Sequence, residues 1–161
     1  SIRALSIAVV CAMALAAPAK AALVSDTSGF SHPITASDFN PIPINTFTRG
    51  PINFTAPNGD TIQFSSTHFS PINFNNGYGF GDNGSWYSSL LMAGLDTSLG
   101  HIDFQFLNGP VSGAGGLLNY APGFGPGQMA ITALDAAENV LEDYPLTFAA
   151  SGTNTGARFY I

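Results

Sequence analysis

The sequence has almost no cysteine and little positive charge. Its one cysteine is Cys11, and only four of the 161 residues are lysine or arginine. A single cysteine cannot form an internal disulfide bond, and it cannot build a cysteine-based zinc cluster. Charged residues make up 9% of the chain, with a formal net charge of −6. Nucleic acids and anionic membranes require clustered basic residues, so we expect neither as a partner.

The N-terminus has the layout of an export signal. Arg3 precedes an apolar run from Ala4 to Ala17, and Pro18-Ala19-Lys20-Ala21 ends in a small-x-small pattern. This layout predicts a signal-peptide helix over residues 1–21, cleaved before Ala22. The run of about fourteen apolar residues is shorter than the roughly twenty that span a bilayer. We therefore expect no membrane insertion of the mature chain.

Cleavage would remove Cys11 and half of the basic residues. Arg49 and Arg158 would then face all ten acidic residues, which gives a formal net charge of −8. An exported chain without cysteine is typical of bacteria, because small secreted eukaryotic domains normally depend on disulfide bonds.

The rest of the chain predicts an all-β fold. Residues 22–48 read as an extended N-terminal arm interrupted by prolines, and 49–161 as a single β-sandwich domain. Residues 52–55 and 61–64 alternate apolar and polar side chains around Pro57-Asn58-Gly59-Asp60, which predicts a hairpin. Further strands are expected at the ranges 86–95, 101–106, 115–120 and 158–161.

One segment allows two interpretations. Residues 130–141 contain Ala, Leu and Glu, which favour a helix. Apolar runs on both sides of residues 135–139 instead favour a hairpin of 129–134 with 140–148, and we predict the hairpin.

Three segments resemble the bacterial PEP-CTERM sorting-domain proteins. They are Gly79-Phe80-Gly81-Asp82-Asn83-Gly84-Ser85-Trp86, the run from Gly115 to Gly123, and Ile131-Thr132-Ala133-Leu134-Asp135 followed by Asn139-Val140-Leu141-Glu142. The resemblance covers roughly residues 50–161. It implies an antiparallel jelly-roll-like β-sandwich, exported by a Gram-negative bacterium to the cell surface or the extracellular matrix.

The sequence also departs from that family. It has no Val-Pro-Glu-Pro tag, no terminal apolar helix and no basic end, and the family's closing strand is missing after Ile161. The resemblance therefore implies a domain truncated at the C-terminus and lacking its last strand. It transfers no catalytic residue.

The motifs for catalysis and cofactor binding are weak. Gly79-x-Gly81-x-x-Gly84 matches a dinucleotide fingerprint by letter, but a β-like run rather than a helix follows it. His32, His68 and His101 have no zinc-ligand spacing, and no Gly-x-Ser-x-Gly elbow occurs. Pairs of carboxylates for glycoside hydrolysis can be drawn, but nothing in the sequence brings two together. We expect no catalytic residues and no enzyme activity.

A ligand-binding surface is predicted at two glycine-rich loops, because sugar rings pack on flat aromatic faces. The residues concerned are Tyr78, Phe80, Asp82, Asn83, Trp86, Tyr87 and Tyr120, with Phe124 beside the second loop. The alternative is that these rings belong to the core. Asp82, Asn83 and Ser85 could also supply oxygen ligands to calcium, the one cofactor considered; the alternative is a solvated turn.

The sequence therefore predicts an exported, non-catalytic surface or matrix protein that associates with exopolysaccharide, with carbohydrate binding at the loops. Polysaccharide or other matrix components are the expected partners. A purely structural or adhesive sandwich without a glycan site is the alternative, and a polysaccharide hydrolase ranks below both.

Overall fold

A computed structural model describes the domain but not the N-terminal segment. It describes residues 39, 41–56, 59–87, 91–95, 97–111, 113–125 and 128–160. Residues 158–160 are described by their backbone alone. The predicted signal peptide and most of the predicted arm lie outside these residues. No helix within the described ranges is long and apolar enough to cross a membrane.

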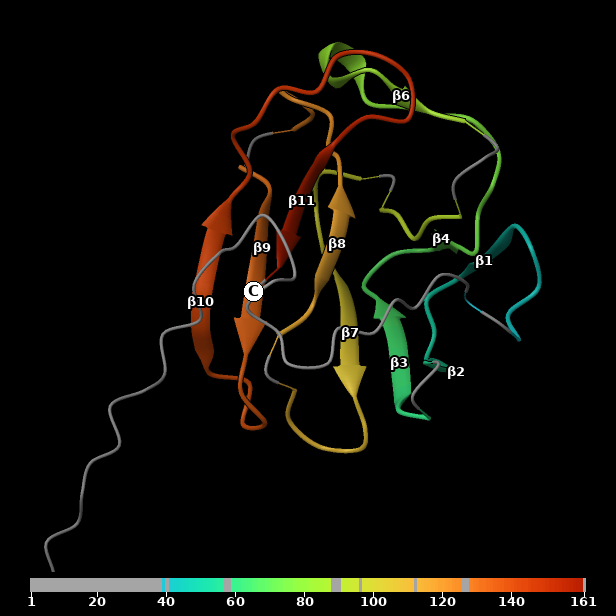
Figure 1. Ribbon diagram of the computed structural model, residues 1–161, viewed down its shortest axis with the longest axis vertical. Coiled ribbons are helices and arrows are strands. Elements are labelled where there is room, and N and C mark those ends of the chain that lie inside the picture. The colour runs from blue at the N-terminus through green and yellow to red at the C-terminus, as the bar shows by residue number, and fades with distance from the viewer. Residues whose placement is uncertain are drawn as a thin grey trace, which may run out of the picture.

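The described chain is all-β, as the sequence predicts. Its elements are β1 (Thr46–Thr48), β2 (Ile52–Thr55), β3 (Thr61–Ser66), β4 (Ser70–Ile72), β5 (Tyr78–Gly79), the 3-10 turn η1 (Gly81–Asn83), β6 (Ser85–Trp86), β7 (Ile102–Phe106), β8 (Gly115–Leu118), β9 (Ala130–Leu134), β10 (Val140–Pro145) and β11 (Ala157–Tyr160). The named strands pair in five small antiparallel sheets. Figure 1 shows β10, β9, β8, β7 and β3 running along the long axis of the molecule.

The three-stranded sheet β2–β3–β7 supports the larger core cluster. Its register pairs Phe54 with Ile62 and Phe64 with Phe104, so that alternate side chains share one face. Phe64 is fully buried in this cluster. The predicted hairpin of 52–55 with 61–64 and the strand near 101–106 are therefore confirmed.

A smaller core cluster is formed around β5, η1 and β6. Phe80, Trp86 and Met92 are its buried members, with Leu117 of β8 among the side chains packed against it. β8 also pairs with β11, so the last described strand forms an antiparallel pair with a strand about forty residues earlier in the chain.

The segment with two interpretations forms a hairpin. β9 and β10 pair from Ala130 opposite Pro145 to Leu134 opposite Val140, with a register shift between Val140 and Glu142. The β-branched and apolar runs on both sides of the turn outweigh the helix propensity of the alanines, because pairing satisfies the backbone of both runs.

One strand prediction is wrong. The expected strand over residues 86–95 ends at Trp86, and the described residues after it contain only an isolated bridge between Met92 and Phe74. Met92 and Phe74 exchange two backbone hydrogen bonds of 3.0 Å, and Gly94 N donates to Pro71 O at 3.0 Å, so residues 92–94 of this segment run antiparallel beside residues 71–74 for one bridge only. Its apolar side chains serve the smaller core cluster without forming a ladder.

Candidate functional site

The predicted loop cluster is largely a packed interior. Phe80 and Trp86 are 6% and 7% exposed, and their ring centroids lie 5.1 Å apart in a T-shaped contact. Such edge-to-face packing is the geometry that buried aromatic rings prefer. These two side chains offer little ring surface on which a sugar could stack.

Asn83 is also buried, and its amide is occupied. Its Nδ2 donates to Phe148 O at 3.3 Å, and its Oδ1 accepts from Ala150 N at 3.2 Å. Its own carbonyl accepts from Asn119 Nδ2 at 3.0 Å. Asn83 therefore joins three segments that are distant in the sequence.

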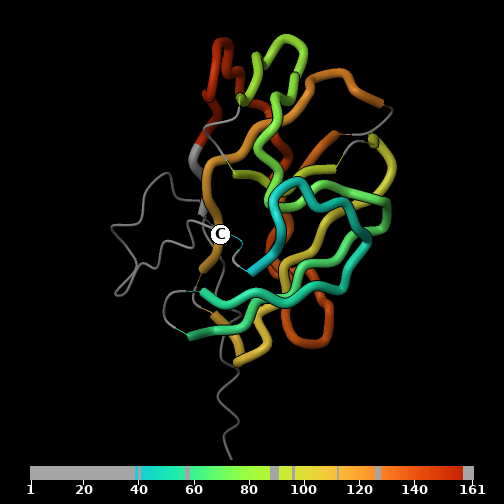
Figure 2. The backbone as a smooth tube through the Cα atoms, turned by 90° about the vertical axis from the view of Figure 1, so that its right-hand side faces the viewer, coloured from blue at the N-terminus to red at the C-terminus, as the bar shows by residue number. Residues whose placement is uncertain are grey.

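The residues after Asn83 also bond to the segment before β11. Trp86 Nε1 donates to Thr155 O at 2.6 Å, and Ser85 N donates to Gly152 O at 3.0 Å. A Cβ at Gly84 would collide with the Gly152 backbone, so only glycine allows this approach. Both views show the loop around η1 lying beside the loop before β11 (Figures 1 and 2).

The remaining predicted loop residues keep access to solvent. Tyr87 is 56% exposed, Asp82 is exposed and Tyr78 is half-buried. Among the described residues, no three side chains of His, Cys, Asp or Glu gather closely enough to hold a metal ion. The Asn83 side-chain oxygen already accepts from Ala150 N, and Ser85 is only half-exposed. Of the three proposed calcium ligands, Asp82 is therefore the only one that is exposed.

Tyr120 and Phe124 line a shallow cavity of about 200 Å³. Its wall also includes Pro122, Gln128, Met129 and Leu146. The Tyr120 hydroxyl donates to Phe148 O at 3.1 Å, and its ring meets the Phe148 ring edge-on at 5.2 Å. These contacts fix Tyr120 in place, whereas Phe124 is 49% exposed.

The lining of this cavity determines what it can bind. None of the described residues along the wall is charged, and the Gln128 amide supplies both a donor and an acceptor. Small-ligand sites have mostly apolar walls with a few polar groups. This cavity is smaller than most such sites, and its wall mixes aromatic, aliphatic and polar surface, with somewhat more polar than apolar surface.

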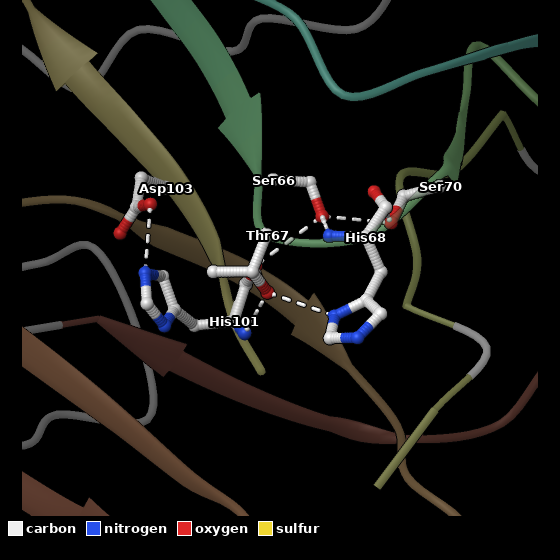
Figure 3. A network of polar contacts seen from close by, with 6 residues as sticks. All are labelled: Ser66, Thr67, His68, Ser70, His101 and Asp103. Atoms are coloured by element: carbon white, nitrogen blue, oxygen red, sulfur yellow. Dashed lines mark hydrogen bonds and ion pairs between the residues drawn. The ribbon is translucent and has the colours of Figure 1, made fainter. Parts of the chain in front are cut away.

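A second polar cluster, which we call the polar turn, comprises residues 66–70 (Figure 3). Ser66 Oγ and Ser70 Oγ lie 2.8 Å apart, Ser70 Oγ donates to His68 O at 2.9 Å, and His68 N donates to Ser66 Oγ at 3.3 Å. Thr67 Oγ1 accepts from His101 N at 3.0 Å, which ties the turn to the start of β7. The polar turn is thus held by hydrogen bonds among its own residues and by one hydrogen bond to the residue before β7.

The polar turn does not form a catalytic triad. Thr67 Oγ1 lies 3.1 Å from His68 Nδ1, whereas Asp103 Oδ2 lies 3.3 Å from His101 Nε2. In a triad one histidine contacts both the hydroxyl and the carboxylate, but here two different imidazoles do so. Both His101 and Asp103 are also well exposed, at 64% and 46% of their side chains.

The sequence analysis missed Phe69, which lies in the polar turn and is 65% exposed. No local signal could have found it, since Phe80 also stands alone among small residues and is nevertheless buried.

Comparison with known proteins identifies no relative. No family model, no curated protein and no solved structure matches this chain.

Proposed function

We propose that this protein is an exported, non-catalytic surface or matrix component that associates with exopolysaccharide. The resemblance to PEP-CTERM proteins and the jelly-roll form of its β-sandwich belong to this proposal. So do the signal peptide and the Gram-negative source. The antiparallel all-β domain is the kind of scaffold that the proposal requires.

The cavity of Tyr120 and Phe124 is the observation that carries the binding part. It combines a fixed ring, a half-exposed ring and an amide around about 200 Å³. A sugar ring has two apolar C–H faces and a rim of hydroxyl groups, which match aromatic walls and an amide respectively. Because no charged side chain lines the described wall, a neutral sugar residue fits this cavity.

Affinity electrophoresis in gels that contain neutral polysaccharides tests this proposal. We expect the wild-type chain to be retarded by at least one neutral polysaccharide, and the F124A variant to lose about tenfold in affinity, as expected when one ring contact is removed. L141A is the matched control, since Leu141 is 47% exposed and lies outside the cavity lining. No retardation of the wild type by any polysaccharide, or equal retardation of F124A, would contradict the proposal.

The adhesive alternative has its own supporting observation. Leu134 and Val140 lie opposite each other next to the β9–β10 turn and are 48% and 61% exposed. An exposed apolar group of this kind can pack against another surface. If packing is the function, V140D will disperse assemblies that light scattering detects in the wild type while leaving polysaccharide binding unchanged.

A further inference from the structure

Phe47 and Phe69 form a stacked pair of exposed rings, which we call the aromatic pair. Their centroids lie 6.2 Å apart at an interplanar angle of 19°, and they are 44% and 65% exposed. Phe47 lies opposite Pro71 in the β1–β4 register, so Phe69 is its diagonal neighbour, within reach for aromatic side chains. Two large, nearly parallel rings left in solvent have an unfavourable hydration free energy that a ligand could remove.

The aromatic pair is held in place before any ligand arrives. The rings of Phe47 and Phe74 make a T-shaped contact, with their centroids 5.4 Å apart and an interplanar angle of 82°. Phe74 in turn packs against the smaller core cluster. Phe69 is followed directly by the fully buried Ser70 and belongs to the braced polar turn. A surface that is already ordered loses little entropy on binding.

The groups able to carry positive charge gather at the same corner. Arg49 is the one lysine or arginine whose side chain the structure describes; it is exposed, and its carbonyl accepts from Ser66 N at 2.8 Å. The β1–β4 register ends with Thr48 opposite Ser70, and Arg49 and Phe69 are the residues next to this last pair in the sequence. His68 and His101 are the two histidines within the described residues; the His68 imidazole contacts the Thr67 hydroxyl, whereas His101 bonds Thr67 through its backbone N–H and its ring lies against Asp103.

Of the acidic residues that the structure describes, Asp103 is the one at this corner. Its Oδ2 lies 3.3 Å from His101 Nε2. The other described acidic residues come from the β2–β3 turn, η1 and the β9–β10 hairpin, namely Asp60, Asp82, Asp135, Glu138, Glu142 and Asp143. Judged by the described acidic residues alone, a carboxylate ligand would meet less repulsion here than at the β2–β3 turn, η1 or the β9–β10 hairpin.

We propose that the aromatic pair and Arg49 form a binding site for a uronic-acid residue of an acidic polysaccharide. One C–H face of the sugar packs on the exposed rings, and its carboxylate lies near the guanidinium of Arg49, with the imidazoles of His68 and His101 beside it. The site rests on the polysaccharide association proposed above, but it differs from the uncharged cavity in the sugar that it takes. Figure 1 shows β1 and β4 on the opposite side of the molecule from β9 and β10, which flank the cavity.

A pair of matched polymers tests this site. Polygalacturonate and its fully methyl-esterified form share the same sugar ring, but only the first carries carboxylates. We expect the wild type to bind polygalacturonate, to lose affinity as salt is added, and to bind the ester at least about tenfold more weakly. Equal binding of both polymers would overturn the assignment of an acidic sugar.

Variants then separate ring contact from charge. F69A should lose about tenfold in affinity for polygalacturonate, because it removes the ring on which the sugar packs. It should remain folded, because the ring is largely exposed and contributes little to the core. R49Q should lose about two- to fivefold, the effect of one exposed charge pair. L141A is the control for an exposed apolar residue elsewhere, and unchanged thermal melting verifies that each variant is folded. Wild-type affinity in F69A would overturn the proposal.

Two further outcomes distinguish the remaining alternatives. Polyglutamate offers carboxylates without a sugar ring, so competition by polyglutamate as strong as that by oligogalacturonate would assign the corner to acidic protein segments and overturn the sugar site. If neutral polysaccharides retard the wild type but polygalacturonate does not, this corner fails while the proposed function stands. If no polysaccharide of either kind binds, the proposed function fails as well.

Discussion

At the residue scale, Asn83 connects the loop around η1 to the segment before β11. It is 2% exposed, and both polar atoms of its amide are bonded to backbone groups of residues 148 and 150. A buried backbone N–H that loses its acceptor costs more free energy than the bond itself contributes. Asn83 is therefore one of the side chains that hold this loop in position, together with Trp86.

Replacement of Asn83 by Ala should lower the free energy of unfolding by about 1–3 kcal/mol, since Ala150 N would lose its acceptor. Thermal melting followed by Trp86 fluorescence measures this change, because Trp86 lies in the adjacent core cluster. D82A is the matched control, since Asp82 is the exposed neighbour, and it should change stability by less than about 0.5 kcal/mol. Equal effects in the two variants would refute this role for Asn83.

The same residue type has opposite roles in this chain. Phe80 is buried against Trp86, whereas Phe69 is exposed and stacked on Phe47. Both phenylalanines lie in segments rich in small polar residues, so local sequence does not separate them. Burial follows from which distant segments cover the ring. The sequence therefore left Phe80 open between a binding surface and the core, where the structure places it, and gave no indication of Phe69.

At the scale of elements, the β9–β10 turn is organised by one carboxylate. Asp135 Oδ1 accepts from Ala137 N at 2.8 Å and Asn139 N at 2.9 Å, while Oδ2 accepts from Asn139 Nδ2 at 2.9 Å. The side-chain hydrogen bond from Asn139, followed by its backbone N–H, lowers the pKa of Asp135 below the ordinary value of 3.8. These bonds favour the ionised form, so the turn is more stable when Asp135 is charged.

A carboxyl group with a lowered folded pKa stabilises the fold above its unfolded pKa, and this contribution is lost as the pH falls through the folded pKa. We therefore expect the β9–β10 turn to loosen as the pH falls below about 3.8. The chemical shifts and exchange rates of the Ala137 and Asn139 amides, followed by NMR during acidification, measure this change. In D135A these amides should exchange faster already at neutral pH, and unchanged exchange there would contradict the prediction.

Hairpins of this kind were predictable because their signals are local. The alternation of Ile62 and Phe64 in β3 and the turn residues around Asp135 define strands without information from the rest of the chain. The segment after Trp86 was not predictable in this way. Its apolar residues indicate burial, but whether they form a strand depends on whether a partner strand lies beside them.

At the scale of the whole molecule, the two proposed sugar sites lie on different sides. The cavity of Tyr120 and Phe124 is uncharged along its described wall, whereas the corner of Phe47, Phe69 and Arg49 carries the described positive charge. Two sites that face apart cannot readily bind adjacent residues of one short oligosaccharide. They can instead bind separate chains.

If both sites bind, the protein should cross-link a mixture of neutral and acidic polysaccharides. We expect an increase in solution viscosity at intermediate protein-to-polymer ratios and a decline at excess protein, as each site fills separately. F124A and F69A should each abolish the increase, whereas L141A should retain it. A viscosity increase that persists in both single variants would show that cross-linking arises elsewhere.

The sequence by itself determined the fold class and several strands, because alternation of side chains and turn chemistry act over a few neighbouring residues. It also determined that the chain is acidic and that positive charge is scarce. Only the tertiary structure decided that Phe80, Asn83 and Trp86 are interior and that Phe47 and Phe69 stack at the surface. The physical reason is that exposure and proximity are set by contacts between segments far apart in the sequence, which no local pattern records.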